Sequence, residues 1–313
     1  MRMTELGLRR CALAAASAAL IVAAPAMAAD GKTKKSWSIN ATSGFQYDDN
    51  VNSQPTDSQS GQADRALVLD VGAQYWAVKH NNLSLEISYD LSQSIYEDLT
   101  DFNFQSHGLS AFAETTLSGF DVSALYGYTR ALLGGHDFLG LHIFQPTVGH
   151  LVTPGWYVSG SYSYQNKDFV DVDSRDANLH AGEISSFLFF NNNKTLLKMG
   201  YRLEDENASG AQHDYLGNYL KAGLKTPASL PLVAKPATFK LDYQFYIKDY
   251  SKITTEIGDE RLDKRHTVTS ALEIPLVDRL RMDLKAEYIR AKSNLSSSDF
   301  AERIYTIAFR LEY

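Results

Sequence analysis

The sequence predicts an all-β protein: a transmembrane, antiparallel, up-and-down β-barrel of about 14 strands, preceded by a cleaved signal peptide. Three observations predict this fold class. Apolar and polar residues alternate along most of the chain, the alternating segments are about ten to fourteen residues long, and short connections alternate with longer polar ones. The clearest segment is 239–248, where odd positions are apolar or aromatic and even positions are mostly polar or charged. This period of two residues is that of a strand with one apolar face.

The N-terminal segment 1–28 has the pattern of a signal peptide. Three arginines within the first ten residues precede the apolar run 11–24, and Ala26-Met27-Ala28 provides a small-residue cleavage site. The apolar run is too short to span a bilayer as a helix. We expect cleavage near Ala28, a short periplasmic N-terminus at 29–35, and one outer-membrane barrel domain at 36–313.

The composition excludes several other classes of protein. The 313 residues include 44% hydrophobic residues and a single Cys, which excludes disorder and a disulfide-rich scaffold. The net charge of −7 argues against a nucleic-acid partner, which needs a basic surface. After residue 28 no run of 18 apolar residues occurs, so we expect no transmembrane helix. A closed barrel is the other way to satisfy backbone hydrogen bonds in lipid.

The alternation places the strands in order along the chain. We expect them at 36–47, 64–77, 83–92, 104–117, 120–131, 141–152, 156–166, 178–190, 194–204, 214–226, 237–249, 263–274, 281–291 and 300–313. The connections after even strands are short, at 79–82, 118–119, 153–155 and 191–193, with a longer exception at 227–236. Those after odd strands are longer, for example 49–63, 93–103, 167–177 and 250–262. Short periplasmic turns and longer outer loops are typical of outer-membrane barrels.

The alternative is a soluble, secreted β-sandwich or β-helix. Such a protein would have strands of about five or six residues, shorter than these segments. Aromatic residues also lie near segment ends, as in the interfacial girdles of membrane barrels. They are Trp37, Tyr47, Tyr89, Trp156, Tyr164, Tyr201 and Tyr288. Both features favour the membrane barrel.

Two local patterns resemble a known family. Segment 44–52 reads Gly-Phe-Gln-Tyr-Asp-Asp-Asn-Val-Asn, and segment 288–303 contains a second group of polar residues before the last alternation. Together they resemble the C-terminal barrel of the surface lipoprotein assembly modifiers and related export barrels, without the helical-repeat domain that precedes it in that family. The matching residues are Tyr47, Asp48, Asp49, Asn50, Asn52, Ser293, Asn294, Asp299 and Arg303. The resemblance implies a fourteen-stranded barrel and a surface lipoprotein or a separate periplasmic helper as partner.

The C-terminal residues Phe309, Leu311 and Tyr313 resemble the signal read by the barrel-assembly machinery. We therefore expect that machinery as a partner during biogenesis. Outer-membrane lipids and lipopolysaccharide are the other expected partners.

If the apolar side chains face lipid, the intervening residues line the lumen. We call the first group of lumen residues the basic wall: Lys198, Arg202, Lys221, Lys225, Lys240, Lys248, Arg281 and Lys285. The second group is the acidic wall: Asp70, Glu86, Asp90, Glu114 and Asp121. Two interpretations remain open. The walls produce a transverse field in a water-filled pore, or opposite charges pair on adjacent strands and fill the interior.

Catalytic, metal and cofactor sites are not expected. The sequence has no G-x-S-x-G and no H-E-x-x-H motif. The segment 134–137 (Gly-Gly-His-Asp), with His142, is expected in an outer loop, where histidines are usually solvated. The acidic loop 168–176 departs from the EF-hand template, and weak cation bridging to lipopolysaccharide is its alternative to a solvated tip.

Three functions are compatible with this barrel in the bacterial outer membrane. The first is a passive channel for small polar solutes. The second is an export or surface-assembly barrel that works with separate periplasmic partners. The third, a structural or adhesive barrel, would need longer outer loops than these.

Overall fold

The computed structural model describes residues 36–53, 58–80, 83–231, 233 and 235–313. The expected signal peptide at 1–28 and the segment 29–35 lie outside the described residues. Within the described part of the chain, no helix is long and apolar enough to cross a membrane. The helical segments there are four 3-10 turns: η3 (Thr100–Phe102), η4 (Asp173–Arg175), η5 (Ala211–His213) and η6 (Ser296–Ser298).

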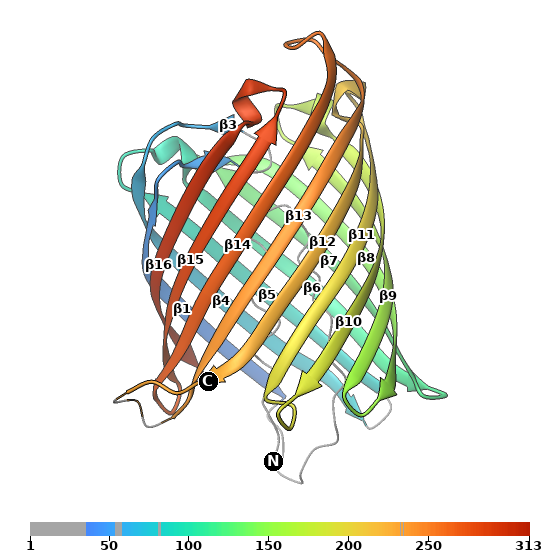
Figure 1. Ribbon diagram of the computed structural model, residues 1–313, viewed down its shortest axis with the longest axis vertical. Coiled ribbons are helices and arrows are strands. Elements are labelled where there is room, and N and C mark those ends of the chain that lie inside the picture. Colours follow the sequence, from blue (N-terminus) through green and yellow to red (C-terminus); the bar gives the residue numbers. More distant parts are fainter. Residues whose placement is uncertain (1–35, 54–57, 81–82, 232, 234) are drawn as a thin grey trace.

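Fourteen long strands form one closed antiparallel barrel in which each strand pairs with its sequence neighbours, and the last pairs with the first (Figure 1). This confirms the predicted fold class and strand number. The strands are β1 (Trp37–Asp48), β4 (Asp64–His80), β5 (Leu83–Tyr96), β6 (Phe104–Leu117), β7 (Phe120–Leu133), β8 (His136–Thr153), β9 (Trp156–Phe169), β10 (Ala177–Phe190), β11 (Thr195–Ala208), β12 (Tyr215–Ala228), β13 (Ala237–Thr254), β14 (Asp259–Val277), β15 (Leu280–Ser293) and β16 (Phe300–Glu312). The short strands β2 (Asn52–Ser53) and β3 (Ser58–Gln59) pair with each other in the first outer connection.

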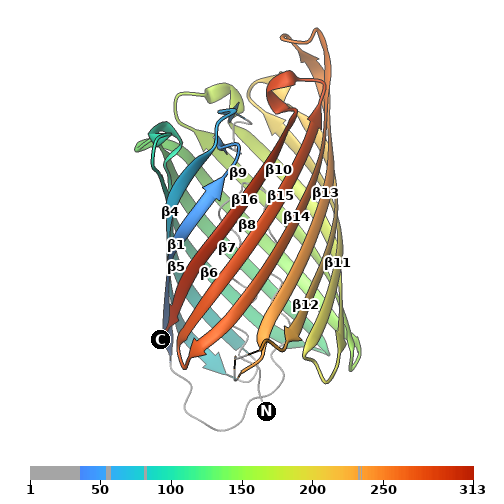
Figure 2. The same cartoon turned by 60° about the vertical axis from the view of Figure 1, so that its left-hand side comes forward.

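The two ends of the barrel differ as the sequence predicts. The 3-10 turns, β2 and β3 lie at one end, and the C-terminus lies at the other, together with most of the short turns (Figures 1 and 2). We call these the outer end and the periplasmic end. At the periplasmic end, Lys235 Nζ lies 2.6 Å from Asp278 Oδ1 in the neighbouring turn. This hydrogen bond lowers the pKa of the exposed Asp278 carboxyl from its ordinary value.

Side chains alternate between the two faces of the barrel wall. The large apolar residues that are most exposed, such as Phe45 and Ile184, are 75% and 70% exposed on the outer face. Polar and charged residues at the intervening positions are largely buried in the interior, for example Glu183, Arg202 and Glu302. This is the reverse of a water-soluble protein, and an outward apolar surface of this extent needs a lipid partner.

The strands extend further at the outer end than the sequence pattern predicts. β5 continues to Tyr96, β9 to Phe169, and β13 to Thr254, so the connections expected at 93–103, 167–177 and 250–262 are shorter. The β13–β14 hairpin projects beyond the rest of the rim (Figure 2). Beyond the lipid-facing part of the outer surface, both faces of a strand contact water. Backbone pairing therefore continues there without the alternation of apolar and polar residues from which the strand was predicted.

The expectation that 134–137 lies in an outer loop was wrong. β7 ends at Leu133 and β8 begins at His136, so Gly134-Gly135 forms a two-residue hairpin turn. Both glycines have positive φ, 58° and 82°, as a type I′ turn requires. His136 and Asp137 are therefore the first residues of a strand, and Asp137 forms an ion pair with Arg130 of the facing strand at 2.6 Å.

Candidate functional site: the barrel interior

The barrel encloses a cavity with about 410 Å³ of room for water. Its lining comes from most strands of the barrel, because one face of every strand points inward. Two sides of the cavity differ in chemistry. On β5 to β9 the lining combines serine, threonine and glutamine side chains with leucine, isoleucine and phenylalanine, while tyrosines and charged groups predominate on β12 to β16.

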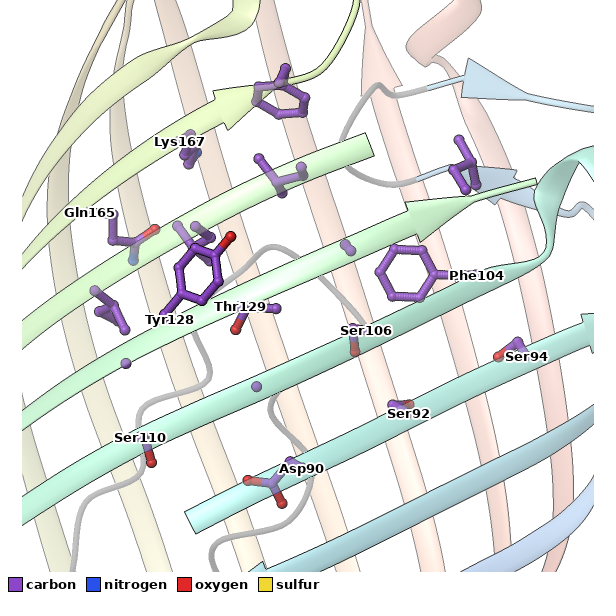
Figure 3. A pocket seen from close by; sticks show the side chains of 18 of the residues that line it. Asp90, Ser92, Ser94, Phe104, Ser106, Ser110, Tyr128, Thr129, Gln165 and Lys167 are labelled. Atoms are coloured by element: carbon purple, nitrogen blue, oxygen red, sulfur yellow. The ribbon is translucent and has the colours of Figure 1, made fainter. Parts of the chain in front are cut away.

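The β5–β6 side of the cavity is a row of small hydroxyl groups. Figure 3 shows Ser92 and Ser94 of β5 with Ser106 and Ser110 of β6 along this surface. Ser110 Oγ is 2.7 Å from Ser88 Oγ on the neighbouring strand. Short hydroxyl side chains leave space in the lumen, which longer side chains would fill.

Residues of the predicted acidic wall belong to this hydroxyl-rich side. Glu86 and Asp90 line the cavity directly. Asp70 accepts a hydrogen bond from Ser92 Oγ at 2.7 Å, and Asp121 accepts one from Thr116 Oγ1 at 2.9 Å. In the described part of the chain, neither Asp70 nor Asp121 forms an ion pair with a cationic side chain. Glu114 lies on β6, opposite Ser84 of β5 and Ser123 of β7.

The basic wall is largely paired with acidic residues of the same strand, of the neighbouring strand or, for Lys221, of the next strand but one. Its ion pairs are Arg202–Glu204 (2.8 Å), Lys221–Glu183 (3.0 Å), Lys240–Glu273 (2.6 Å), Lys285–Glu287 (3.1 Å) and Arg281–Glu312 (3.4 Å). The ammonium group of Lys198 lies 6.0 Å from the ring centre of Phe187. Lys225 lies opposite Lys240 on the neighbouring strand. Of the two interpretations of the lumen charges, ion pairing describes the geometry of this wall.

Four tyrosines on β12 and β13 form a buried aromatic group in the interior. Tyr215 packs against Tyr250 with ring centres 5.3 Å apart, and Tyr219 packs against Tyr246 at 5.1 Å. The hydroxyl groups of Tyr215 and Tyr219 donate to Glu204 Oε1 at 2.9 and 2.5 Å. The ammonium group of Lys248, another member of the basic wall, lies 4.1 Å from the ring centre of Tyr215.

Some interior charges were not identified from the sequence. Lys167 pairs with Glu206 at 2.5 Å, and Arg261 pairs with Asp263 at 2.5 Å. Arg265 also lines the cavity. All lie near the outer end, where the outward neighbours are themselves polar, such as Lys264 and Asn166. The alternation of apolar and polar residues there does not show which face of the strand points inward. With the correct strand boundaries, the inward face could have been extrapolated from the rest of the strand.

The two patterns that resemble the assembly-modifier family come together in space at the closing seam between β1 and β16. Asp49 accepts a hydrogen bond from the Arg303 backbone N–H at 2.6 Å and pairs with its guanidinium at 3.2 Å. Asn50 donates to the Ala301 carbonyl at 3.1 Å, and Asn52 donates to Glu302 at 2.5 Å. These contacts join segments about 250 residues apart and fasten the first loop to the last hairpin.

The remaining residues of the two patterns lie next to this junction. Asp48 is buried at the end of β1 and accepts from the Asn50 backbone N–H, and Tyr47 is partly exposed on the outer surface. In the last hairpin, Asn294 bonds both the N–H of Leu262 and the carbonyl of Glu260 on β14. Ser293 Oγ accepts from the Leu295 N–H, and Asp299 pairs with Arg290 at 2.9 Å. These are contacts that shape and hold the outer rim.

The C-terminal residues lie on the outer face of the periplasmic end. Phe309 and Leu311 are about half exposed there, and Tyr313 stacks on Trp37 with ring centres 5.2 Å apart. No group of three or more His, Cys, Asp or Glu side chains among the described residues is arranged to hold a metal ion.

Comparison with known proteins places the fold but not a family. No protein-family model and no curated sequence matches the chain. Among solved structures, an anion-selective porin from Comamonas acidovorans is similar with a TM-score of 0.50 and 12% identity, over 88% of this chain and 98% of the porin. A loop-deletion mutant of OmpT, an outer membrane protein of Vibrio cholerae, is similar with a TM-score of 0.52 and 9% identity, over 89% of this chain and 100% of that chain.

CdiB from Acinetobacter baumannii is also similar, with a TM-score of 0.50 and 10% identity. The match covers 90% of this chain but only 61% of CdiB, so this chain spans about three fifths of that protein. At such low identities, the likeness concerns the fold alone. The protein has the closed antiparallel barrel fold of bacterial outer-membrane proteins.

Proposed function

We propose that the protein is a channel in the bacterial outer membrane through which small polar solutes pass. The observation that carries this proposal is the combination of an apolar outer face with an interior that holds many buried polar and charged side chains and a cavity lined in part by hydroxyl groups. Only a barrel whose strands contact lipid on one side and water on the other has that combination. The side chains of the lumen decide which solutes pass.

The charge arrangement of the lumen favours cations over anions. Five of the eight residues of the basic wall form ion pairs, while Asp70 and Asp121 accept hydrogen bonds from hydroxyl groups and form no ion pair among the described residues. A low-dielectric wall that carries uncompensated charge of one sign attracts counter-ions into the pore. The porin from Comamonas acidovorans is anion-selective, but a shared fold at 12% identity does not transfer its selectivity.

Planar-bilayer recordings test this proposal. The full-length protein, reconstituted in a salt gradient, should give discrete conductance steps and a reversal potential of the sign expected for cation preference. The double variant D70N/D121N should move the reversal potential toward zero, because it removes two lumen charges without changing side-chain size. D278N removes one exposed carboxylate of a periplasmic turn and is the matched control that should keep the wild-type value. A correctly folded barrel without conductance would contradict the proposal.

The second candidate is an export or surface-assembly barrel that works with a surface lipoprotein or a separate periplasmic helper. The two patterns that resemble the assembly-modifier family favour it, since their residues form one continuous junction at the outer end of the closing seam. Deletion of the gene, followed by surface labelling of lipoproteins in intact cells, tests this candidate. Loss of one surface lipoprotein would support it, and unchanged labelling of all of them would argue against it.

A further inference from the structure

A basic patch lies on the outward face of the last three strands, near the outer end. We define it by Lys264 and His266 on β14, Arg290 and Lys292 on β15, and Arg303 on β16. These residues alternate with interior residues such as Arg265, so their side chains point away from the lumen. Lys264, His266, Lys292 and Arg303 are exposed, and Arg290 is partly exposed.

The centre of this patch contains two like charges in direct opposition. Lys264 and Lys292 are facing partners in the antiparallel ladder between β14 and β15. Like charges at such positions repel each other and destabilise the sheet. In the described part of the chain, neither ammonium group forms an ion pair or a hydrogen bond. Asp249 of β13 faces Leu262, a diagonal position to Lys264, and forms no ion pair with it.

Two other pairs of facing cations in the described part of the barrel have acids nearby. Lys225 faces Lys240 in the lumen, where Glu273 pairs with Lys240 at 2.6 Å. Arg281 faces Arg310, and these two pair with Glu312 and Asp283 respectively. Within the basic patch, Arg290 and Arg303 have Asp299 and Asp49 as partners. The Lys264–Lys292 pair therefore lacks the anion that the lumen pairs have.

The surface below the patch is apolar and aromatic. Tyr288, Val268 and Tyr305 follow on the outward faces of the same strands, and Leu284 and Ile307 continue toward the periplasmic end. The guanidinium of Arg303 lies 6.0 Å from the ring centre of Tyr288. Tyrosine at this level is typical of the interface between lipid tails and headgroups. A ligand that spans both regions needs an anionic head and acyl chains.

We propose that this face of β14–β16 binds a phosphorylated glycolipid of the outer leaflet, with a phosphate between Lys264 and Lys292. The phosphate replaces their mutual repulsion with two charge-assisted contacts, and Arg290 lies within the same patch. The acyl chains lie along the apolar surface below, which selects a lipid over free phosphate. The proposal rests on placement in the outer membrane, and it is independent of what passes through the lumen.

Native mass spectrometry of the full-length protein tests this site. The protein is refolded from urea into detergent, so that it carries no lipid, and is incubated with bis-phosphorylated lipid A in the presence of EDTA. The chelator removes contacts bridged by divalent cations. The wild type should retain one tightly bound lipid A, and K264Q/K292Q should bind it at least tenfold more weakly. R130Q also removes one outward cation at the outer end and should bind as the wild type does.

Each outcome decides for or against the site. Equal binding of lipid A by K264Q/K292Q and the wild type would overturn the proposal, as would equal binding of dephosphorylated lipid A. Displacement of lipid A by millimolar inorganic phosphate would overturn the choice of a lipid as ligand.

The difference in migration between unheated and heated samples on a gel reports the folded fraction. If the double variant folds poorly, K264Q and K292Q alone should each weaken binding several-fold. Lost lipid binding with unchanged conductance would leave the proposed channel intact.

Discussion

At the scale of single residues, the interior is held by buried charges that depend on one another. Glu204 is 5% exposed and accepts hydrogen bonds from Arg202, Tyr215 and Tyr219. Arg202 is 3% exposed, and its Nη1 has no hydrogen-bond partner among the described residues. The carboxylate of Glu204 is thus the main counter-charge of a buried guanidinium.

The substitution Glu204→Gln should therefore destabilise the barrel strongly. It leaves the charge of Arg202 buried without its carboxylate, which typically costs about 3 to 5 kcal/mol of folding free energy. Urea unfolding of the refolded protein, followed by tryptophan fluorescence, measures the change. The double substitution Arg202→Met with Glu204→Leu removes both charges and should recover most of the loss. If E204Q unfolds at the wild-type urea concentration, the pair does not contribute as the geometry indicates.

At the scale of strands, one cross-strand contact recurs on the outer face. A tyrosine hydroxyl lies 2.6 to 2.9 Å from a histidine Nδ1 on the neighbouring strand in four places. In each, the histidine is two residues from the position directly opposite the tyrosine. The pairs are Tyr89–His107, Tyr126–His142, Tyr162–His180 and Tyr243–His266. This recurring pair joins two amphipathic rings, a combination suited to the aromatic belt at the membrane interface.

A double-mutant cycle on Tyr162 and His180 tests whether the recurring pair stabilises the sheet. Tyr162→Phe removes the hydroxyl, His180→Ala removes the ring, and the coupling free energy should be about 0.2 to 1 kcal/mol. Urea unfolding of the four proteins in detergent micelles gives this energy. A coupling of zero would indicate that the contact forms without adding stability.

At the scale of the whole molecule, closure of the barrel depends on a close approach between its two end strands. Gly44 of β1 faces Ala308 of β16. A Cβ at Gly44 would overlap the carbonyl oxygen of Ile307 and the backbone of Ala308. No flexible side chain can move aside there, because the obstruction is largely backbone. Glycine at this position permits the seam to form.

The substitution Gly44→Ala should accordingly impair closure. Overpacking of this kind typically costs about 1 to 3 kcal/mol, and we expect a smaller fraction of heat-modifiable, folded protein after refolding. Gly182→Ala is the matched control, because a Cβ at Gly182 meets no atom within 4 Å. Equal folded fractions for the two variants would show that the seam tolerates a wider separation.

The charges of the lumen together determine its preference for cations or anions. Paired bases on one side and hydroxyl-bound aspartates on the other predict the cation preference that D70N/D121N should reduce. The fold by itself does not predict it, since a barrel of similar architecture belongs to an anion-selective porin.

The sequence by itself determined the barrel, the number of strands and which face of each strand is apolar, because alternation with period two is local and repeats in every strand. It did not determine the outer ends of the strands, where both faces contact water and the pattern ends although β-pairing continues, as at β9 and β13. Only the tertiary structure decided the contacts between distant segments. The contact of Asp49 with Arg303 depends on closure of the barrel, and the facing position of Lys264 and Lys292 depends on strand register. The local pattern of residues determines neither the closure nor the register.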